Sequence, residues 1–156
     1  MPSEPSGGPP SFSEGLCALL KSAGVLKSSV IRVVGAGRLH ALLWLCRHGY
    51  EQVGLMRGAS PAEPAEVVLV PSACPPEALE QILAQAAHLQ PDGIVVLGTR
   101  RGSAEATRAT SDMLGRHGFR VERQVSGHHR DIYLARRAAA LRNCLTSGGQ
   151  FTPFRP

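Results

Sequence analysis

A strand-to-helix turn with two glycines is the part of the sequence best suited to hold a ligand. The β-branched run Val30-Ile31-Arg32-Val33-Val34 stops at Gly35-Ala36-Gly37, and a helix-forming segment begins at Arg38. Glycine lets a ligand approach the backbone, and the N–H groups at a helix N-terminus attract anionic groups. We therefore predict that Gly35, Ala36 and Gly37 bind an adenosine-type cofactor or a phosphate. A tight turn with a purely conformational role would explain the same glycines.

Two arginines follow a later strand, at a position where a substrate could be held. Arg100 and Arg101 come shortly after the apolar run Ile94–Leu97, and open α/β sheets bind ligands at the carboxyl ends of their strands. The basic residues after Thr99 are 11 arginines, against 4 acidic residues in the same stretch. Because arginine suits carboxylates and phosphates, we predict an anionic substrate at Arg100 and Arg101, with a solvated turn as the alternative.

The cysteines and histidines do not form a ligand set. Cys17, Cys46, Cys74 and Cys144 are 29, 28 and 70 positions apart, unlike a paired-ligand metal motif. The pair His128-His129 precedes a strand, where adjacent side chains point to opposite faces. We expect reduced thiols, a hairpin turn at the histidines and no metal.

Elements that would position these residues alternate along the chain. We expect helices over 13–24, 38–47, 76–89 and 103–116, and strands over 30–34, 50–56, 67–70, 94–97, 119–125 and 132–135. Alternation of strands and helices is typical of a parallel sheet, whereas two consecutive strands form a hairpin. The predicted fold class is α/β: a Rossmann-like, mostly parallel sheet covered by helices on both faces, with a C-terminal antiparallel hairpin.

Length and composition predict one domain. The chain has 156 residues, of which 43% are hydrophobic, so we expect a single body over 12–145 with a disordered tail at 1–11 and a flexible tail at 146–156. The longest apolar run, Ala41–Cys46, is too short to span a membrane, and the N-terminus does not read as a secretory signal. We therefore expect a cytoplasmic protein. An aromatic content of 4% argues against a single-stranded nucleic-acid binder.

The helix predicted after the glycine turn is apolar on two faces. One face holds Leu39, Leu42, Leu43 and Cys46, and the other holds Ala41, Trp44 and Leu45. The sheet needs only one of them, so the other could bind a second copy or another protein. We predict an interface around Trp44 and Leu45, with burial inside the monomer as the alternative. A non-catalytic dimerisation or scaffold module is therefore one candidate function.

Taken together, residues 12–137 resemble the class I S-adenosylmethionine-dependent methyltransferases in a short form. The resemblance rests on the strand that ends at Gly35-Ala36-Gly37, on Pro91–Leu97 followed by a helix, on the step His117-Gly118-Phe119, and on the closing strand Asp131–Arg137. It implies S-adenosylmethionine as the cofactor, held by the glycine turn and near Pro71 and Ser72.

The chain departs from this family at its cofactor-binding positions. The family's acidic residue two places before the first glycine is Val33 here, and its third glycine is Leu39. The family also usually ends its second strand with an acidic residue that binds the cofactor ribose, whereas this strand ends Leu55-Met56-Arg57. Losing that carboxylate removes a hydrogen bond worth roughly 1.5–3 kcal/mol, which lowers affinity about ten-fold or more.

Two segments of the family pattern are also altered. Only residues 58–65 precede the next strand segment, so the usual third strand and its helix are expected to be missing. The segment Pro71–Pro76 lacks the Asp or Asn that the family often places there. The resemblance therefore implies a cofactor-binding domain with weak or lost methyl transfer, a pseudoenzyme.

A nicotinamide dinucleotide is the alternative cofactor. Gly35–Leu39 resembles the opening of small Rossmann reductases, and Arg57 stands where a 2′-phosphate could be held. Against this reading, the chain has no substrate domain and no obvious hydride-transfer residue.

Overall fold

The computed structural model describes residues 12–138 except 57–64, 73–75, 87–91 and 128. The predicted tails at 1–11 and 146–156, Arg57, Cys74 and His128 lie outside the described residues. In chain order the elements are α1 (Phe12–Ser22), β1 (Val30–Val33), α2 (Arg38–Arg47), β2 (Gln52–Leu55), β3 (Val67–Val70), α3 (Pro76–Gln85), β4 (Ile94–Arg100), α4 (Ala104–Arg116), β5 (Phe119–Ser126) and β6 (Arg130–Arg137).

The described strands form one sheet in the order β2-β1-β3-β4-β6-β5. Strands β1 to β4 pair in parallel, and β6 runs antiparallel to both β4 and β5. The predicted fold class is therefore confirmed. Because the chain leaves β1 first toward β2 and later returns to its other side as β3, the strand order reverses between β1 and β3. Open α/β sheets bind ligands at such a switch point.

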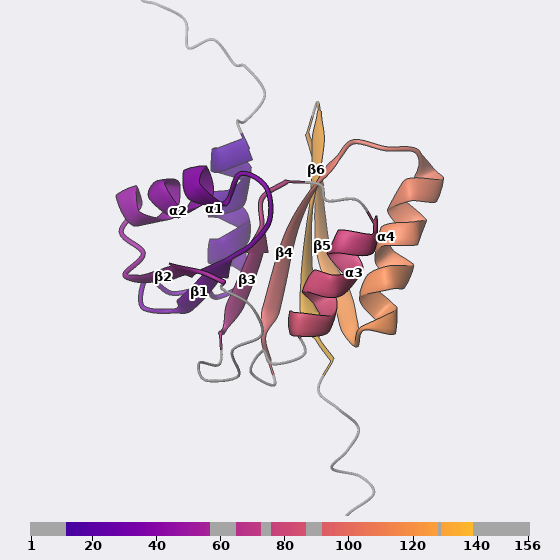
Figure 1. Ribbon diagram of the computed structural model, residues 1–156. Coiled ribbons are helices and arrows are strands. Elements are labelled where there is room, and N and C mark those ends of the chain that lie inside the picture. The colour runs from indigo at the N-terminus through magenta and orange to yellow at the C-terminus, as the bar shows by residue number, and fades with distance from the viewer. Residues whose placement is uncertain (1–11, 57–64, 73–75, 87–91, 128, 139–156) are drawn as a thin grey trace, which may run out of the picture.

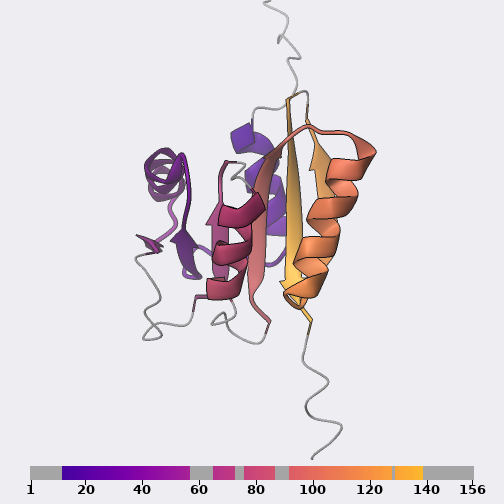
Figure 2. The same ribbon diagram turned by 45° about the vertical axis from the view of Figure 1, so that its right-hand side comes forward.

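Helices cover both faces of the sheet, two on each (Figures 1 and 2). On one face, α1 and α2 bury side chains such as Leu20 and Leu45 against Ile31 and Val96. On the other, α3 and α4 bury Leu83 and Leu114 against strand residues that include Val68, Val95 and Tyr133. The buried residues of β3, β4 and β6 alternate between the two cores, as expected for strands buried on both faces.

Two helices end with the same His-Gly pair. His48 ends α2 and His117 ends α4, and the following Gly49 and Gly118 have φ angles of 85° and 83°. Glycine adopts this left-handed conformation without the steric cost that a Cβ brings, so it suits a residue that terminates a helix. The sequence interpretation of both pairs as helix ends is confirmed.

Strands β4 and β6 are longer than predicted. The sequence indicated 94–97 and 132–135, whereas the strands run to Arg100 and from Arg130. The reason is their antiparallel pairing, whose register continues from Ile94↔Arg136 to Arg100↔Arg130. Backbone hydrogen bonds thus extend both strands into residues that are not apolar, and Arg100 belongs to a strand rather than to a turn.

The sheet is short on the side of β2. Among the described residues, no strand lies beyond β2, and β3 begins only twelve positions after Leu55. This arrangement agrees with the expected loss of the family's third strand.

Within the same described segments, no helix combines the length and the hydropathy that crossing a membrane requires.

Candidate functional site

The carboxyl end of β1 and the adjoining end of β3 form the switch point of the sheet. Val34 donates its N–H to the carbonyl of Leu69 at 3.0 Å, and Met56 donates to the carbonyl of Val33 at 3.0 Å. These bonds hold the end of β1 between its two neighbours. The glycine turn therefore leaves the sheet from a fixed position.

Gly35 and Gly37 both have left-handed backbones. Their φ angles are 93° and 76°, a region that L side chains rarely adopt. Gly37 is the N-cap of α2, and the first helical bond runs from the Ala41 N–H to the Gly37 carbonyl at 3.1 Å. No side chain caps this helix, and its first turn contains no acidic residue. The N-terminus of α2 is therefore available to an electronegative group of a ligand.

The turn after β1 lies against the segment after β3. A methyl group placed on Gly37 would be 3.9 Å from the Cβ of Pro71. The structure thus brings Gly37 and Pro71 together, as predicted for a shared cofactor site. Ser72 is half-buried beside Pro71 and has a partner in the protein. Arg57, which was also predicted to bind the cofactor, lies outside the described residues.

The predicted substrate arginines lie at the same edge of the sheet. Arg100 ends β4 and is exposed. Arg101 is also exposed, and its backbone N–H donates to the carbonyl of His129 at 3.0 Å while its guanidinium lies 3.5 Å from the carbonyl of Gly127. Arg101 therefore leans toward the β5–β6 hairpin rather than toward β3.

A third arginine, which the sequence did not indicate, reaches across this edge. Arg130 begins β6, and its Nη1 donates to the carbonyl of Pro71 at 3.3 Å. Since β4 lies between β3 and β6, the side chain spans the end of β4. Arg130 thus brings a positive charge to the segment that follows β3. Extending the predicted last strand by two residues toward its N-terminus would have placed Arg130 at the carboxyl edge of the sheet.

The same strand carries a buried acid. Asp131 is 4% exposed. Within the described segments, the other buried side chains of the core are hydrophobic. The Oδ1 of Asp131 has no hydrogen-bond partner there. In the sheet register Asp131 lies beside Thr99 of β4 and Ser126 of β5. The sequence pattern predicts a strand only from position 132, and the family resemblance a closing strand from Asp131, but neither indicates a buried acid.

The family's acidic positions hold apolar side chains. Val33 is 0% exposed and packs in the core under α1 and α2, so it contributes no polar group to the crevice. Leu39, in place of the third glycine, is 61% exposed in the first turn of α2. Leu55 and Met56, at the end of β2, are half-buried hydrophobic residues.

The predicted interface needs one correction. Leu45 is 0% exposed in the core, so it does not reach the surface. Trp44 is half-buried, and its ring stacks on His48 with 4.0 Å between the ring centroids. Leu39 and Leu43, which are 61% and 56% exposed, form the outward apolar face of α2 instead. The sequence left open which face the sheet would cover, and it covers the face of Ala41 and Leu45.

The described residues contain no group of three or more His, Cys, Asp or Glu side chains that could hold a metal ion. Cys17 and Cys46, the cysteines within the described part, are free thiols.

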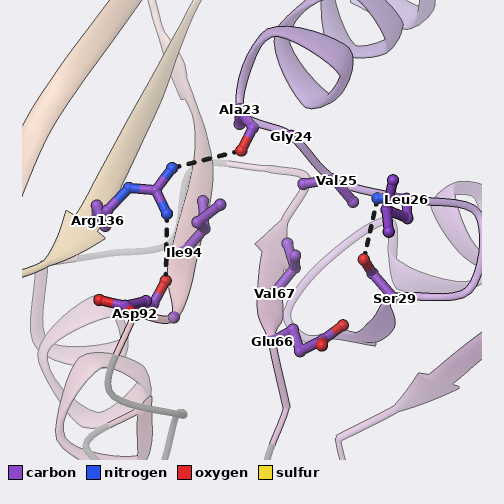
Figure 3. Close-up of a pocket in the computed structure, with 11 residues that line it drawn as sticks. Ala23, Gly24, Val25, Leu26, Ser29, Glu66, Val67, Asp92, Ile94 and Arg136 are labelled. Atoms are coloured by element: carbon purple, nitrogen blue, oxygen red, sulfur yellow. Dashed lines mark hydrogen bonds between the residues drawn. The ribbon is translucent and has the colours of Figure 1, made fainter.

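A pocket of about 230 Å³ opens at the opposite end of the sheet (Figure 3). Several of its polar groups are bonded within the protein. Arg136 donates to Glu122 Oε1 at 2.8 Å and to the carbonyls of Asp92 and Ala23, each at 3.4 Å. The Glu66 carboxylate accepts the Val30 N–H at 2.8 Å. These contacts link β6 to β5, to Ala23 after α1 and to Asp92 before β4, and they link Glu66 before β3 to β1, so they hold this end of the sheet together.

Comparisons with known proteins connect this chain to one class of fold. No family model and no curated protein sequence matches it. Several solved structures do, at low sequence identity. The precorrin-6y C5,15-methyltransferase of Geobacter metallireducens is 16% identical with a TM-score of 0.54, over 80% of this chain and 88% of that one.

Two further structures give the same result. The magnesium protoporphyrin IX methyltransferase of Synechocystis, solved with S-adenosylhomocysteine, is 14% identical over 81% of this chain and 82% of that one, with a TM-score of 0.55. The precorrin 8w decarboxylase of Methanobacterium thermoautotrophicum is 20% identical over 86% and 95%, with a TM-score of 0.53. The chain therefore has a class I S-adenosylmethionine-dependent methyltransferase-like fold. At such identities the likeness defines the fold alone.

Proposed function

We propose that this chain binds S-adenosylmethionine, or a related adenosine cofactor, at the switch point between β1 and β3, and that its methyl transfer is weak or lost. The observation that carries the proposal is the closeness of the segments after β1 and β3, since a methyl group added at Gly37 would lie 3.9 Å from the Cβ of Pro71. Gly35 has a left-handed backbone, and no side chain caps the start of α2. The backbone N–H groups of this turn are therefore available to a ligand at the carboxyl edge of the sheet. The methyltransferase-like fold supports the choice of this cofactor.

The side chains around this edge favour weak binding. Valine at position 33 and leucine at position 39 replace the family's acid and third glycine, and β2 ends in Leu55. Without a ribose-binding carboxylate, affinity should be about ten-fold or more below that of a complete site. Transfer itself can proceed by positioning alone, without a dedicated base. Weak activity is therefore compatible with these side chains.

Calorimetric titration with S-adenosylhomocysteine tests cofactor binding, and α2 supplies a matched pair of variants. Gly37→Ala and Gly49→Ala place the same methyl group on left-handed residues, with φ of 76° and 85°, at opposite ends of the helix. Both should lower the free energy of unfolding by about 1 kcal/mol. Only Gly37→Ala should also weaken cofactor binding, by about ten-fold, which is roughly 1.4 kcal/mol.

The same titration separates the alternatives. Heat from S-adenosylhomocysteine and S-adenosylmethionine that Gly37→Ala reduces supports the proposal. Binding of NADH or NADPH in their place would favour the nicotinamide alternative. If none of the four ligands binds at millimolar concentration, the glycine turn is only a turn and the proposal is wrong.

The arginines at this edge support an anionic acceptor for any remaining transfer. Arg100, Arg101 and Arg130 come from β4, the segment after it, and β6. The double variant Arg100→Ala/Arg101→Ala should leave cofactor binding unchanged, since neither side chain belongs to the crevice between β1 and β3. It should weaken binding of a carboxylate or phosphate probe by about three-fold or more. Unchanged anion binding would remove these two residues from the site.

A second candidate function is a non-catalytic interaction module, as a homodimer or with a protein partner. The exposed leucines of α2 favour it, because Leu39 and Leu43 are one turn apart and together leave an apolar strip at the surface. Light scattering should give a dimeric mass if the strip joins two copies, and Leu43→Glu should restore the monomer. A monomeric mass for the unaltered chain would exclude the dimer.

We place the protein in the cytoplasm, which fluorescence microscopy of a tagged chain would test.

A further inference from the structure

We infer that Asp131 binds the acceptor substrate, by accepting a hydrogen bond from an N–H or O–H group that lies close to the substrate's anionic group. The inference deepens the proposed function and depends on it to the extent that the substrate binds at the carboxyl edge of the sheet. It specifies the acceptor as an anionic molecule with a hydrogen-bond donor.

The first argument is the unused hydrogen-bonding capacity of Asp131. Asp131 is 4% exposed, and its Oδ1 has no hydrogen-bond partner in the described part of the chain. Buried polar atoms almost always have partners, because an unpaired one has lost its water without replacing it. A buried acceptor of this kind requires an explanation, and a ligand that completes it is one. No other buried side-chain oxygen or nitrogen of the described residues stands in this condition.

The second argument is the position of Asp131 in the sheet. It shares a face with Tyr133 and Ala135, which pack under α3 and α4. Its register partners are Thr99 and Ser126, at the carboxyl end of β4 and in the hairpin. With β4 between β3 and β6, two strand spacings separate it from the end of β3, roughly 10 Å. A small substrate could span that distance to a cofactor between β1 and β3.

The third argument is the charge around this carboxylate. Arg130 and its register partner Arg100 lie on the opposite face of the sheet from Asp131, but all three residues are at the same edge of the sheet, where Arg101 follows the end of β4. These three cations disfavour a positively charged ligand. They favour an anion, whose carboxylate or phosphate they can bind while a neighbouring hydroxyl or N–H group donates to Asp131. The ligand class is therefore an anion with a donor, rather than a metal ion or an amine.

The amino end of the sheet provides the matched comparison. Glu66 is also a partly buried carboxylate at the end of a strand, but it accepts the Val30 N–H at 2.8 Å. Its bond stabilises the fold directly. The structural role of one carboxylate and the proposed binding role of the other can therefore be separated by changing each to its amide.

Thermal unfolding gives the first test. Asp131→Asn should raise the melting temperature by about 3 °C, or leave it unchanged, because it removes a buried carboxylate whose Oδ1 has no partner in the described part of the chain. Glu66→Gln should lower it by about 3 °C, because a neutral acceptor binds the Val30 N–H more weakly. A fall for Asp131→Asn as large as that for Glu66→Gln would show that Asp131 stabilises the fold, and would overturn the inference.

Binding of two small anions gives the second test. Glycolate and acetate differ by one hydroxyl donor, and both can be titrated at millimolar concentration while the backbone amide signals of Thr99, Ser126 and Asp131 are followed by NMR. The unaltered chain should bind glycolate about three- to ten-fold more tightly than acetate. In Asp131→Leu the two anions should bind equally, and in Glu66→Gln the preference should remain. Equal binding in the unaltered chain would contradict the inference.

Cofactor titration of the same variants keeps this inference apart from the proposed function. Asp131→Leu should bind S-adenosylhomocysteine as the unaltered chain does, because Asp131 lies two strands from β3. If the unaltered chain binds no cofactor but prefers glycolate at Asp131, the cofactor proposal fails and the anion site stands. If the cofactor binds and the glycolate preference is absent, only the inference about Asp131 fails.

Discussion

The two ends of the sheet use their polar groups in opposite ways. At the amino end, the pocket beside α1 is lined by groups that already bond one another, as Arg136 does with Glu122 and with the carbonyls of Ala23 and Asp92. At the carboxyl end, α2 begins without a side-chain cap and Asp131 leaves an oxygen unpaired among the described residues. The amino end holds the fold together, and the carboxyl end offers bonds to a ligand.

For this reason we place the proposed site at the unpaired hydrogen-bonding groups of the carboxyl end rather than in the pocket. Figure 3 shows Arg136 directed at backbone carbonyls across the pocket, so a ligand there would have to compete with bonds that join several strands. At the carboxyl end, a ligand adds bonds without breaking any at Asp131. Substitutions at the amino end should therefore change stability, and those at the carboxyl end should change binding.

The largest effect should come from Arg136→Ala. This change removes three hydrogen bonds that connect β6 to Glu122 of β5, to Ala23 after α1 and to Asp92 before β4. Because the side chain is partly exposed, we expect a loss of about 1–2 kcal/mol in the free energy of unfolding, measured by urea denaturation. Arg120→Ala, on the exposed side of β5, should change it by less than about 0.5 kcal/mol. If Arg136→Ala also weakened S-adenosylhomocysteine binding, the division between the two ends would fail.

A smaller effect, on binding rather than stability, is expected for Arg130→Met. Methionine keeps much of the apolar stem but removes the charge that Arg130 brings to the Pro71 carbonyl. We expect a three- to ten-fold rise in the dissociation constant for acetate and glycolate, with a stability loss below about 1 kcal/mol. Arg123→Met, on exposed β5, serves as the control. A stability loss comparable with that of Arg136→Ala would make Arg130 a structural residue.

The smallest effect concerns Tyr50, which lies in the core just before β2. Burial raises the pKa of Tyr50 above its usual 10.0, with a further contribution from Cys17. The folded state thus retains the phenol proton where the unfolded state loses it. Stability should therefore be fully present below pH 10.0 and fall as the pH rises through the higher folded pKa. Tyr50→Phe should show a shallower decline in melting temperature over this range, whereas equal slopes would refute the shift.

Most of the fold could be predicted because its signals are local. The buried strand β3 and the helix α2 have the bounds expected from the sequence, since β3 is a continuous apolar run that stops at Pro71 and α2 lies between Gly37 and Gly49. The extensions of β4 to Arg100 and of β6 from Arg130 could not be predicted in this way. They depend on hydrogen bonds between strands about thirty residues apart, and no periodicity within either segment reports that pairing.

The candidate site divides along the same line. Gly35 and Gly37 could be predicted as turn residues because few other residues adopt their φ angles. Asp131 looked like an ordinary polar residue at the start of a strand, and only the arrangement of β4, β5 and β6 reveals its burial. The prediction of Leu45 at an interface is wrong because the sequence shows two apolar faces on α2 and does not indicate which one the sheet covers.

The place of β6 in the sheet also constrains how the protein can be made. It is the last strand in the described chain, yet it lies between β4 and β5 (Figure 1). Tyr133 on β6 is the largest of the fully buried side chains among the described residues. During translation the ribosome therefore exposes β1 to β5 before the strand that joins β4 to β5 exists. Until Arg137 has emerged, β4 keeps an open hydrogen-bonding edge and Leu97 lacks its partner. Folding of this domain should therefore be completed only once β6 has emerged, with a chaperone-sensitive interval before β6 inserts.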